Sequence, residues 1–527
     1  MLRRILPAAN AIFVGHMIPR LGSIILVPLF LKTWSATLYG EYLALFAVVS
    51  YLSGLDIGVQ QASVNRLTQA YAKGDLDEYC AVQHTTITFY LFLATVVTLL
   101  VTMFARSFPI SRWIGLKVTD ASIGSRVIIL LAAYVMWSLP MRLIVATYQS
   151  TGNLARTQWI ANFQQILVMV LTAVALVSGA GMLSIAVLQI ATVGLIIVYV
   201  LFDLRRRFPA VFPGVRKARL SALRDLAHPS LLFALLLVGN LIAFQGSTLI
   251  VSAVIGGLAV AVLSISKAMI DLIRQVLYSI TLALCPDFAR MEVLGEFKKL
   301  RTIHRLTVAA TAALTLALAA SVWYEGPKII TTWTHGRIEP DVTLLRLFLV
   351  LLVFQTPWAA SSTIGTATNR HETQAVGYFF AAVSGVSLIA ALVHRLGTWA
   401  VPLGLTLGEA LFCYHFVIQS TCRTIRERYA SFAFRFWSGF AAVAAAVLAA
   451  GWTIHYYVPA PTFVRWIIMG LCTLIASLTC GWVIWLTPAD RALLSSRVRL
   501  LVQFLRGEIV SVRARAKTVA SPQELTL

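Results

Sequence analysis

Charged side chains are scarce in this sequence, and their scarcity excludes a soluble globular protein. Only 12% of the 527 residues are charged, whereas 59% are hydrophobic and the mean hydropathy is +0.82. A soluble domain carries about 25% charged residues. The pattern of an outer-membrane barrel, roughly ten-residue segments of alternating hydrophobicity, is also lacking. The composition therefore predicts a helical membrane protein.

Signatures of catalysis and of metal binding are lacking as well. The phosphate-binding loop GxxxxGK[ST] does not occur, so the sequence encodes no nucleotide hydrolysis. The six cysteines have no CxxC spacing and no evident outer partner for a disulfide; they are Cys80, Cys285, Cys413, Cys422, Cys472 and Cys480. We expect no enzymatic activity and no cofactor, with H+ or Na+ as the conceivable coupling ion.

Long apolar runs are present along most of the chain. Each is close to 20 residues, enough for an α-helix to cross about 30 Å of hydrocarbon. The expected spans lie near residues 11–31, 40–64, 84–105, 126–150, 159–178, 182–203, 230–252, 257–284, 306–324, 343–363, 374–394, 399–419, 434–454 and 464–486. The predicted fold class is an all-α polytopic membrane protein with about fourteen transmembrane helices, in two groups of six and a final pair.

The distribution of basic residues predicts which side of the bundle faces the cytoplasm. The chain has 43 Lys and Arg against 21 Asp and Glu, a net charge of +22. Most of the basic residues fall in alternate loops, which is typical of loops on the cytoplasmic side. We therefore expect a protein of the bacterial cytoplasmic (inner) membrane with both termini in the cytoplasm. Anionic membrane lipids are the expected partners of the basic segments, and we expect no nucleic acid partner.

The sequence contains two copies of one membrane unit. Matching residues keep one separation: Asn153, Thr157 and Gln158 recur 216 positions later as Asn369, Thr373 and Gln374, and Gly40 recurs 217 positions later as Gly257. Six helices is an even number, so both copies enter the membrane from the same side, as in parallel-repeat transporters. The predicted organisation is an N-lobe at 1–203, a basic linker at 204–229, a C-lobe at 230–419, two further helices at 420–486 and a basic tail at 487–527.

Ionisable side chains inside the expected spans carry the functional prediction. Such groups are costly in a bilayer and are expected to face a cavity. The basic ones are Arg20, Arg142, Lys267 and Arg274, and the acidic ones are Asp56, Asp271 and Glu409. The spacing of the three in the eighth span places them on one helical face, where Lys267 and Asp271 can pair and leave Arg274 as excess positive charge. A cationic cavity suits phosphate, because the arginine fork binds two oxygens.

These charges also have structural interpretations. Lys267 with Asp271 can form a salt bridge between lobes, and Asp56 can satisfy a helix break beside Gly58. Cavity lining is the interpretation we favour for Arg20 and Arg274.

The first 160 residues resemble a known family. The matching pieces are Arg20-Leu21-Gly22, Pro28, the turn Tyr39-Gly40, Leu55-Asp56-Ile57-Gly58, the loop Tyr71-Ala72-Lys73-Gly74-Asp75 and the turn Thr151-Gly152-Asn153. Their order and the span count resemble Wzx-type O-antigen and exopolysaccharide flippases, a branch of the multidrug/oligosaccharidyl-lipid/polysaccharide (MOP) exporter superfamily. The motifs match best in the first 160 residues, and the architecture fits nearly the whole chain.

The resemblance implies a carrier that moves undecaprenyl-pyrophosphate-linked oligosaccharide from the inner to the outer leaflet by alternating access, for surface polysaccharide synthesis. Polysaccharide polymerase and chain-length proteins are then plausible partners by analogy. In this hypothesis Arg20, Arg142 and Arg274 hold the pyrophosphate with Lys267 in support, and Asp56, Asp271 and Glu409 are the ion-coupling candidates.

Three alternatives stay open at the level of sequence. A lipid II flippase of the same superfamily fits equally well and differs only in its substrate. A MATE-type multidrug or cation antiporter shares the lobes but is expected to have an acid-rich cavity. A membrane polysaccharide polymerase usually presents a large outer loop with catalytic acids, whereas the longest outer loops here, near 106–125 and 325–342, are short.

Overall fold

The described part of the chain is helical throughout. The computed structural model describes residues 2–56, 58–108, 113–219, 221–222, 231–284, 288, 291–292, 294–368, 372–459, 462–486 and 491, and these contain no strand. The first half comprises α1 (Leu2–Thr33), α2 (Ala36–Ser50), the 3-10 helix η1 (Tyr51–Asp56), α3 (Val59–Lys73), α4 (Leu76–Ser107), α6 (Ala121–Ser150), α7 (Leu154–Val177), α8 (Met182–Arg207) and η2 (Pro209–Val211).

The second half repeats this order and adds a final pair. It comprises α10 (Leu231–Leu241), the π-helix η4 (Ile242–Gly246), α11 (Ser247–Val254), α12 (Gly257–Ala283), α14 (Phe297–Trp333), α15 (Val342–Ala367), α16 (Glu372–Leu396), the 3-10 turn η5 (Gly397–Trp399), α17 (Ala400–Glu409), the π-helix η6 (Ala410–Tyr414), α18 (His415–Thr424), α19 (Tyr429–Tyr457) and α20 (Thr462–Ile484).

Each expected span coincides with helix. Within the described residues, eleven helical stretches are long and apolar enough to cross a membrane, and one of them, Glu372–Thr424, folds back at η5 and holds two of the expected spans. The helix α12 is not among the eleven, because Lys267, Asp271 and Arg274 interrupt its apolar run. The helical membrane fold is therefore confirmed, and the count of fourteen spans stays a prediction.

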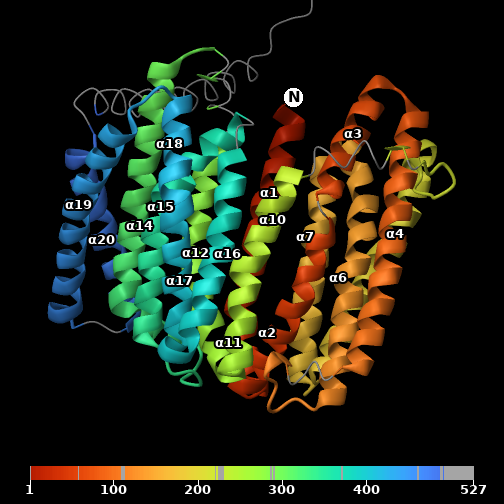
Figure 1. Ribbon diagram of the computed structural model, residues 1–527, viewed down its shortest axis with the longest axis horizontal. Helices are drawn as coiled ribbons and strands as arrows, with labels where there is room; N and C mark the ends of the chain where they lie inside the picture. The colour runs from red at the N-terminus through yellow and green to blue at the C-terminus, as the bar shows by residue number, and fades with distance from the viewer. Residues whose placement is uncertain are drawn as a thin grey trace, which may run out of the picture.

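The predicted parallel repeat is confirmed by matching helix contacts in the two halves. The helices α1 and α7 pack together as α10 and α16 do, and α4 packs on α6 as α14 packs on α15. The contact of α2 with α6 likewise repeats as that of α12 with α15. Figure 1 shows the two lobes side by side, with α4, α6 and α7 in one and α14 to α18 in the other.

The two lobes meet where the repeat brings identical residues together. A Cβ atom added to Gly40 of α2 would collide with the main-chain carbonyl of Gly257 of α12, so only glycine allows these helices to approach so closely. Nearby, Ser252 Oγ donates to the carbonyl of Ile114 at 2.6 Å, and Arg337 Nη1 donates to that of Leu31 at 2.8 Å. These contacts lie at the end of the bundle where α1 ends and α2 begins, which we call the closed end.

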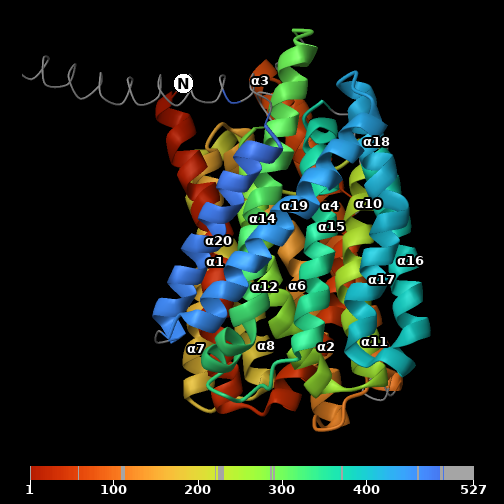
Figure 2. The ribbon, with the colours of Figure 1, turned by 90° about the vertical axis from the view of Figure 1, so that its left-hand side faces the viewer.

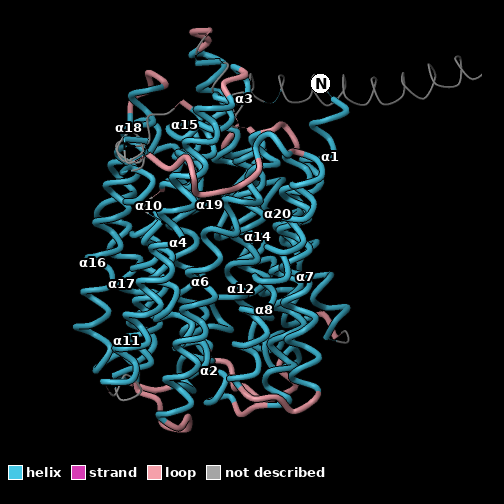
Figure 3. The backbone as a smooth tube through the Cα atoms, turned by 90° about the vertical axis from the view of Figure 1, so that its right-hand side faces the viewer, coloured by secondary structure: helices cyan, strands magenta, loops and turns pink. Residues whose placement is uncertain are grey.

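The opposite end carries the segments that the charge pattern assigns to the cytoplasm. The start of α1, the turn between α3 and α4, and α18 lie there, and loops gather at both ends of the bundle with helices between them (Figures 1 and 3). The linker after α8 is fastened to α4 at this end: Lys217 N donates to His84 Nδ1 at 3.1 Å, and Arg219 N donates to Thr85 Oγ1 at 2.8 Å. We call this the basic end. The linker beyond Ala222 and, apart from Arg491, the tail at 487–527 lie outside the described residues, as does Asn369 of the repeat.

The final pair of helices packs on the flank of the C-lobe. Both α19 and α20 contact α14 and each other, as Figure 2 shows from that side. The buried carboxylate of Glu325 in α14 fastens the pair: it accepts from His455 Nδ1 of α19 at 2.8 Å and from Arg465 Nη2 of α20 at 3.1 Å. The pair is thus an addition to the C-lobe with no counterpart in the first half.

Candidate functional site

The charged face of α12 lies in the middle of the molecule, but its ion pair differs from the one expected. Asp271 Oδ1 accepts from Arg274 Nη1 at 2.6 Å. Lys267 Nζ instead donates to Ser247 Oγ at 2.8 Å and to the carbonyl of Phe244 at 3.3 Å. The suggested pairing of Lys267 with Asp271 is therefore wrong. The π-turn η4 presents the carbonyl of Phe244 to the lysine and the start of α11 presents the hydroxyl of Ser247, while Asp271 pairs with Arg274 on the same face of α12.

Arg20 connects the two lobes. From α1 of the N-lobe its Nη1 donates to the main-chain carbonyl of Asp271 at 2.8 Å, and its Nη2 donates to Gln275 Oε1 at 2.6 Å. Arg20 does not line either of the two larger cavities described below. A structural contact between lobes accounts for this side chain, and its predicted contact with substrate stays a prediction.

Glu409 lies behind the wall of the C-lobe cavity. It is 6% exposed and ends α17 immediately before the π-turn η6. Its Oε1 accepts from Gln355 Nε2 at 2.5 Å and its Oε2 from Trp358 Nε1 at 3.1 Å. A void of about 20 Å³, enough for one water molecule, brings Glu409 together with Lys267, Asp271 and Arg274. Four of the seven predicted residues thus share one small polar chamber.

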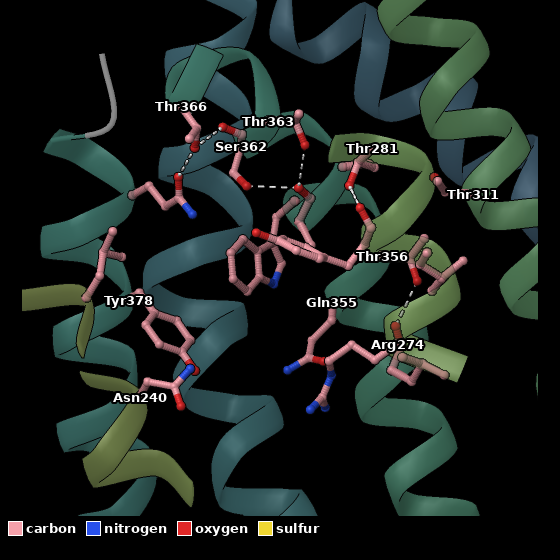
Figure 4. A pocket seen from close by; sticks show the side chains of 18 of the residues that line it. Asn240, Arg274, Thr281, Thr311, Gln355, Thr356, Ser362, Thr363, Thr366 and Tyr378 are labelled. Carbon is pink, nitrogen blue, oxygen red and sulfur yellow. Dashed lines mark hydrogen bonds between the residues drawn. The ribbon is translucent and has the colours of Figure 1, made fainter. Parts of the chain in front are cut away.

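The C-lobe cavity lies beside this chamber and has a volume of about 450 Å³. Of the described residues that line it, Arg274 alone is charged, and most of the other polar groups are hydroxyls and amides. Figure 4 shows these groups pointing into the space from α10, α12, α14, α15 and α16: Asn240, Arg274, Thr281, Thr311, Gln355, Thr356, Ser362, Thr363, Thr366 and Tyr378. Trp358 and Tyr378 add aromatic surface to the same wall.

The N-lobe cavity is larger, at about 980 Å³, and holds the other two predicted residues. Arg142 lines it from α6 and, among the residues that the structure describes, has no hydrogen-bond or ion-pair partner. Asp56 is occupied: its Oδ1 accepts from Gln60 N at 3.2 Å and from the hydroxyl of Tyr90. Asp56 therefore satisfies the helix break before α3, where Gly58 has a φ of +72°, as its structural interpretation predicts.

The two cavities are copies of one another. Their lining residues correspond at a constant separation of 217 positions, in the pairs Gln60 and Leu277, Gln61 and Tyr278, Val64 and Thr281, Ser138 and Gln355, Met141 and Trp358, Arg142 and Ala359, Val145 and Ser362, Ala146 and Thr363, and Gln149 and Thr366. The repeated glutamines Gln158 and Gln374 also line one cavity each. The duplicated unit therefore includes a pocket in each lobe, and both volumes fall in the range of ligand sites, about 300 to 1,000 Å³.

Sequence reasoning missed the uncharged lining. Glutamine, serine and threonine side chains inside a span commonly form hydrogen bonds between helices. Their presence alone therefore does not indicate a cavity. The usable signal is the pair of glutamines on either side of the turn at residues 151–153, Gln149 and Gln158, of which Gln158 recurs in the repeat as Gln374. Among the described residues no group of His, Cys, Asp and Glu could hold a metal ion.

The fold is that of a known superfamily of transporters. The chain superimposes on an inward-facing multidrug resistance MATE family transporter of the MOP superfamily with a TM-score of 0.66 and 17% identity, covering 80% of this chain and 98% of that one. It superimposes on the lipid II flippase MurJ, in its inward closed conformation, with a TM-score of 0.68 and 11% identity, covering 91% and 98%. The chain therefore has the MOP transporter fold.

A third solved structure also superimposes on this chain. It is a MOP superfamily transporter from Pyrococcus furiosus, described as having a binding pocket of reverse polarity that suggests a different function, with a TM-score of 0.57, 15% identity, and 82% and 96% of the chains covered. No protein-family model and no curated protein matches the sequence. The fold is thus the one expected from the sequence, and the assignment to the Wzx-type branch stays a prediction.

Proposed function

We propose that this protein is a flippase that carries an undecaprenyl-pyrophosphate-linked oligosaccharide across the bacterial cytoplasmic membrane, for the synthesis of a surface polysaccharide. The MOP fold, shared with a lipid II flippase, supports a transporter for a large amphipathic substrate. The observation that carries the proposal is Arg142, a cation without a partner inside a cavity of about 980 Å³ that is otherwise lined mainly by amide, hydroxyl, aromatic and apolar groups. A pyrophosphate attached to a glycan needs this combination.

The cavity chemistry weighs against export of organic cations. A site for cations is expected to present unpaired acids. In the part of the chain that the structure describes, the C-lobe cavity has Arg274 as its one charged lining residue, and the N-lobe cavity has Arg142 and an Asp56 that is already bonded. A lipid II flippase would bind its pyrophosphate in the same way, and its substrate differs from the proposed one only in the glycan.

The arrangement of the lobes supports alternating access. The contacts between lobes at Gly40 and Gly257, and at Ser252 and Ile114, lie at the closed end, while both cavities extend toward the basic end, where Gln158 and Gln374 lie next to the turns between helices. If the basic end is cytoplasmic, both cavities receive substrate from the inner leaflet, and rocking of the lobes would expose them outside.

The experiment is a transport assay with purified protein in liposomes. Movement of an undecaprenyl-pyrophosphate-linked oligosaccharide across the bilayer is compared for the parent protein and Arg142→Ala. Loss of a hydrogen bond to a charged group costs roughly 1.5–3 kcal/mol, so we expect binding to weaken by about 10- to 100-fold. Arg126→Ala is the matched control, because Arg126 belongs to the same helix but lies outside the cavity.

Three results would decide between the functions. Transport of the lipid-linked glycan that Arg142→Ala loses and Arg126→Ala keeps would support the proposal. Equal transport by both variants would remove Arg142 from the site. Transport of lipid II or of a cationic dye in place of the lipid-linked oligosaccharide would assign the protein to one of the alternatives.

A further inference from the structure

We infer that the N-lobe cavity selects lipid-linked glycans that carry no acidic sugar, and that a cluster of glutamine side chains makes the selection. This inference rests on the proposed function and narrows its substrate class. The cluster consists of Gln60, Gln149, Gln158, Gln164 and Gln165, from α3, α6 and α7.

The amide groups of this cluster are available to a ligand. All five side chains line the N-lobe cavity, and none makes a side-chain hydrogen bond to another of the described residues. By contrast, Gln83 Nε2 donates to Thr147 Oγ1 at 2.9 Å and Gln189 Nε2 donates to the hydroxyl of Tyr42 at 3.0 Å. Glutamines elsewhere in the same lobe therefore do bond helices together, and the cavity glutamines do not.

The fold does not require an amide at two of these positions. In the second copy of the unit, Leu277 and Thr366 take the places of Gln60 and Gln149 beside the corresponding cavity, whereas Gln374 keeps the amide of Gln158. An uncompensated amide in a membrane helix is costly, so packing alone does not account for Gln60 and Gln149. The difference between the two copies points to a ligand that the N-lobe cavity contacts through more amide groups than the C-lobe cavity does.

Amide side chains suit sugar hydroxyls. Each amide offers two donors and an acceptor, and each hydroxyl both donates and accepts, so one glutamine can bond two neighbouring hydroxyls of a ring. A sugar carboxylate offers acceptors alone and carries a full charge. Its recognition would call for a further cation near the glutamines.

The charges in the two cavities leave no cation for an acidic sugar. Arg274 is paired with Asp271 at 2.6 Å. Among the described residues of the N-lobe lining, Arg142 is the one basic side chain, and the proposed function assigns it to the pyrophosphate. Asp56 lies in the same lining and would repel a second negative group. A glycan with a uronic acid would therefore leave its charge unpaired.

The test compares two substrates that differ at one sugar. Undecaprenyl-pyrophosphate bearing an uncharged tetrasaccharide and the same lipid bearing a tetrasaccharide with one hexuronic acid are offered to the parent protein in liposomes. We expect the uncharged substrate to move at least about tenfold faster. Equal rates, or faster movement of the acidic substrate, would overturn the inference and leave the proposed function intact. Movement of neither would overturn both.

Two variants connect this preference to the glutamines. The double variant Gln149→Leu/Gln158→Leu should lose about tenfold in transport of the uncharged substrate, because it removes two amide contacts, whereas the control Gln189→Leu should not. Gln158→Arg should raise transport of the acidic substrate relative to the uncharged one. An unchanged ratio in Gln158→Arg, in protein that still transports the uncharged substrate, would contradict the assignment.

Discussion

Arg142 differs from the other six predicted site residues because, within the described part of the chain, it makes no hydrogen bond or ion pair. Asp271 and Arg274 neutralise each other, Arg20 is bonded to Asp271 and Gln275 across the lobes, and Asp56 holds a helix break. An arginine kept unpaired at membrane depth is costly, which is why we assign it to the substrate.

Glu409 is the acid that we expect to couple an ion to transport. Its hydrogen-bond donors, Gln355 and Trp358, are neutral and both line the C-lobe cavity, so a change in its charge would alter the cavity wall. Glu409→Gln should transport substrate down its gradient but lose acceleration by an imposed pH gradient. Glu78→Gln, at the exposed start of α4, is the control. A Glu409→Gln protein that still responds fully to the gradient would remove this residue from coupling.

The sequence predicted which residues are charged inside the membrane, but not how they pair. Lys267 and Arg274 are both within reach of Asp271 on the same helical face, so spacing alone could not choose between them. The choice depends on Ser247 and the carbonyl of Phe244, which the π-turn η4 brings to Lys267. A π-turn adds one residue to a turn without changing the apolar pattern, and so leaves no signal in sequence.

At the scale of elements, the crossing of α2 and α12 closes one end of the molecule. The crossing depends on two glycines that the repeat places opposite each other, Gly40 and Gly257. The sequence shows that these glycines are 217 residues apart. It does not show that they are in contact, because a sequence repeat does not give the position of the axis that relates its two copies.

A larger residue at this crossing should force the lobes apart. Overpacking costs roughly 1–3 kcal/mol, so we expect Gly40→Leu to lower the thermal stability and to make the closed end reactive toward thiol reagents at a cysteine placed at Ser252. Gly194→Leu is the control, because an added side chain at Gly194 would meet open space. Equal stability and equal reactivity of the two variants would contradict this role.

The loop before α6 is held by a buried acid. Glu41 is 0% exposed, and its carboxylate accepts from the backbone N–H groups of Lys117, Val118 and Thr119 and from the Thr119 hydroxyl, at 2.5 to 2.8 Å. Each buried donor left unsatisfied costs about 1–3 kcal/mol, so Glu41→Ala should destabilise the protein by roughly 2–5 kcal/mol in thermal unfolding. Glu339→Ala, in another loop at the closed end, should change little, and a similar small effect of Glu41→Ala would show that the loop holds by other contacts.

At the scale of the whole molecule, transport requires that the closed end open. Trp333 Nε1 of the C-lobe donates to the carbonyl of Ile24 in the N-lobe at 2.8 Å, so cysteines at these positions are within reach of a short bifunctional thiol reagent. In a protein with its six native cysteines replaced, the cross-linked Ile24→Cys/Trp333→Cys variant should stop transporting and should recover on reduction, while the single variants should be unaffected. Transport through the cross-linked protein would rule out rocking about this end.

The architecture was more predictable than the site. The apolar runs predicted the helices, and the even number of helices in each unit predicted the parallel repeat. Both predictions depend on the bilayer and not on the details of side-chain packing. The cavities depend on which face of each helix turns inward, and the apolar runs do not show that face. The pairs of lining residues 217 positions apart became visible only once both cavities were in place.

The most direct test of the central claim is deletion of the gene in its own host, with lipid-linked glycans and surface polysaccharide measured in the same cells. A flippase predicts loss of the surface polymer and accumulation of undecaprenyl-linked repeat units on the cytoplasmic face, with a mass that identifies the glycan. Normal surface polymer together with altered resistance to cationic drugs would contradict the account and make the protein a drug exporter.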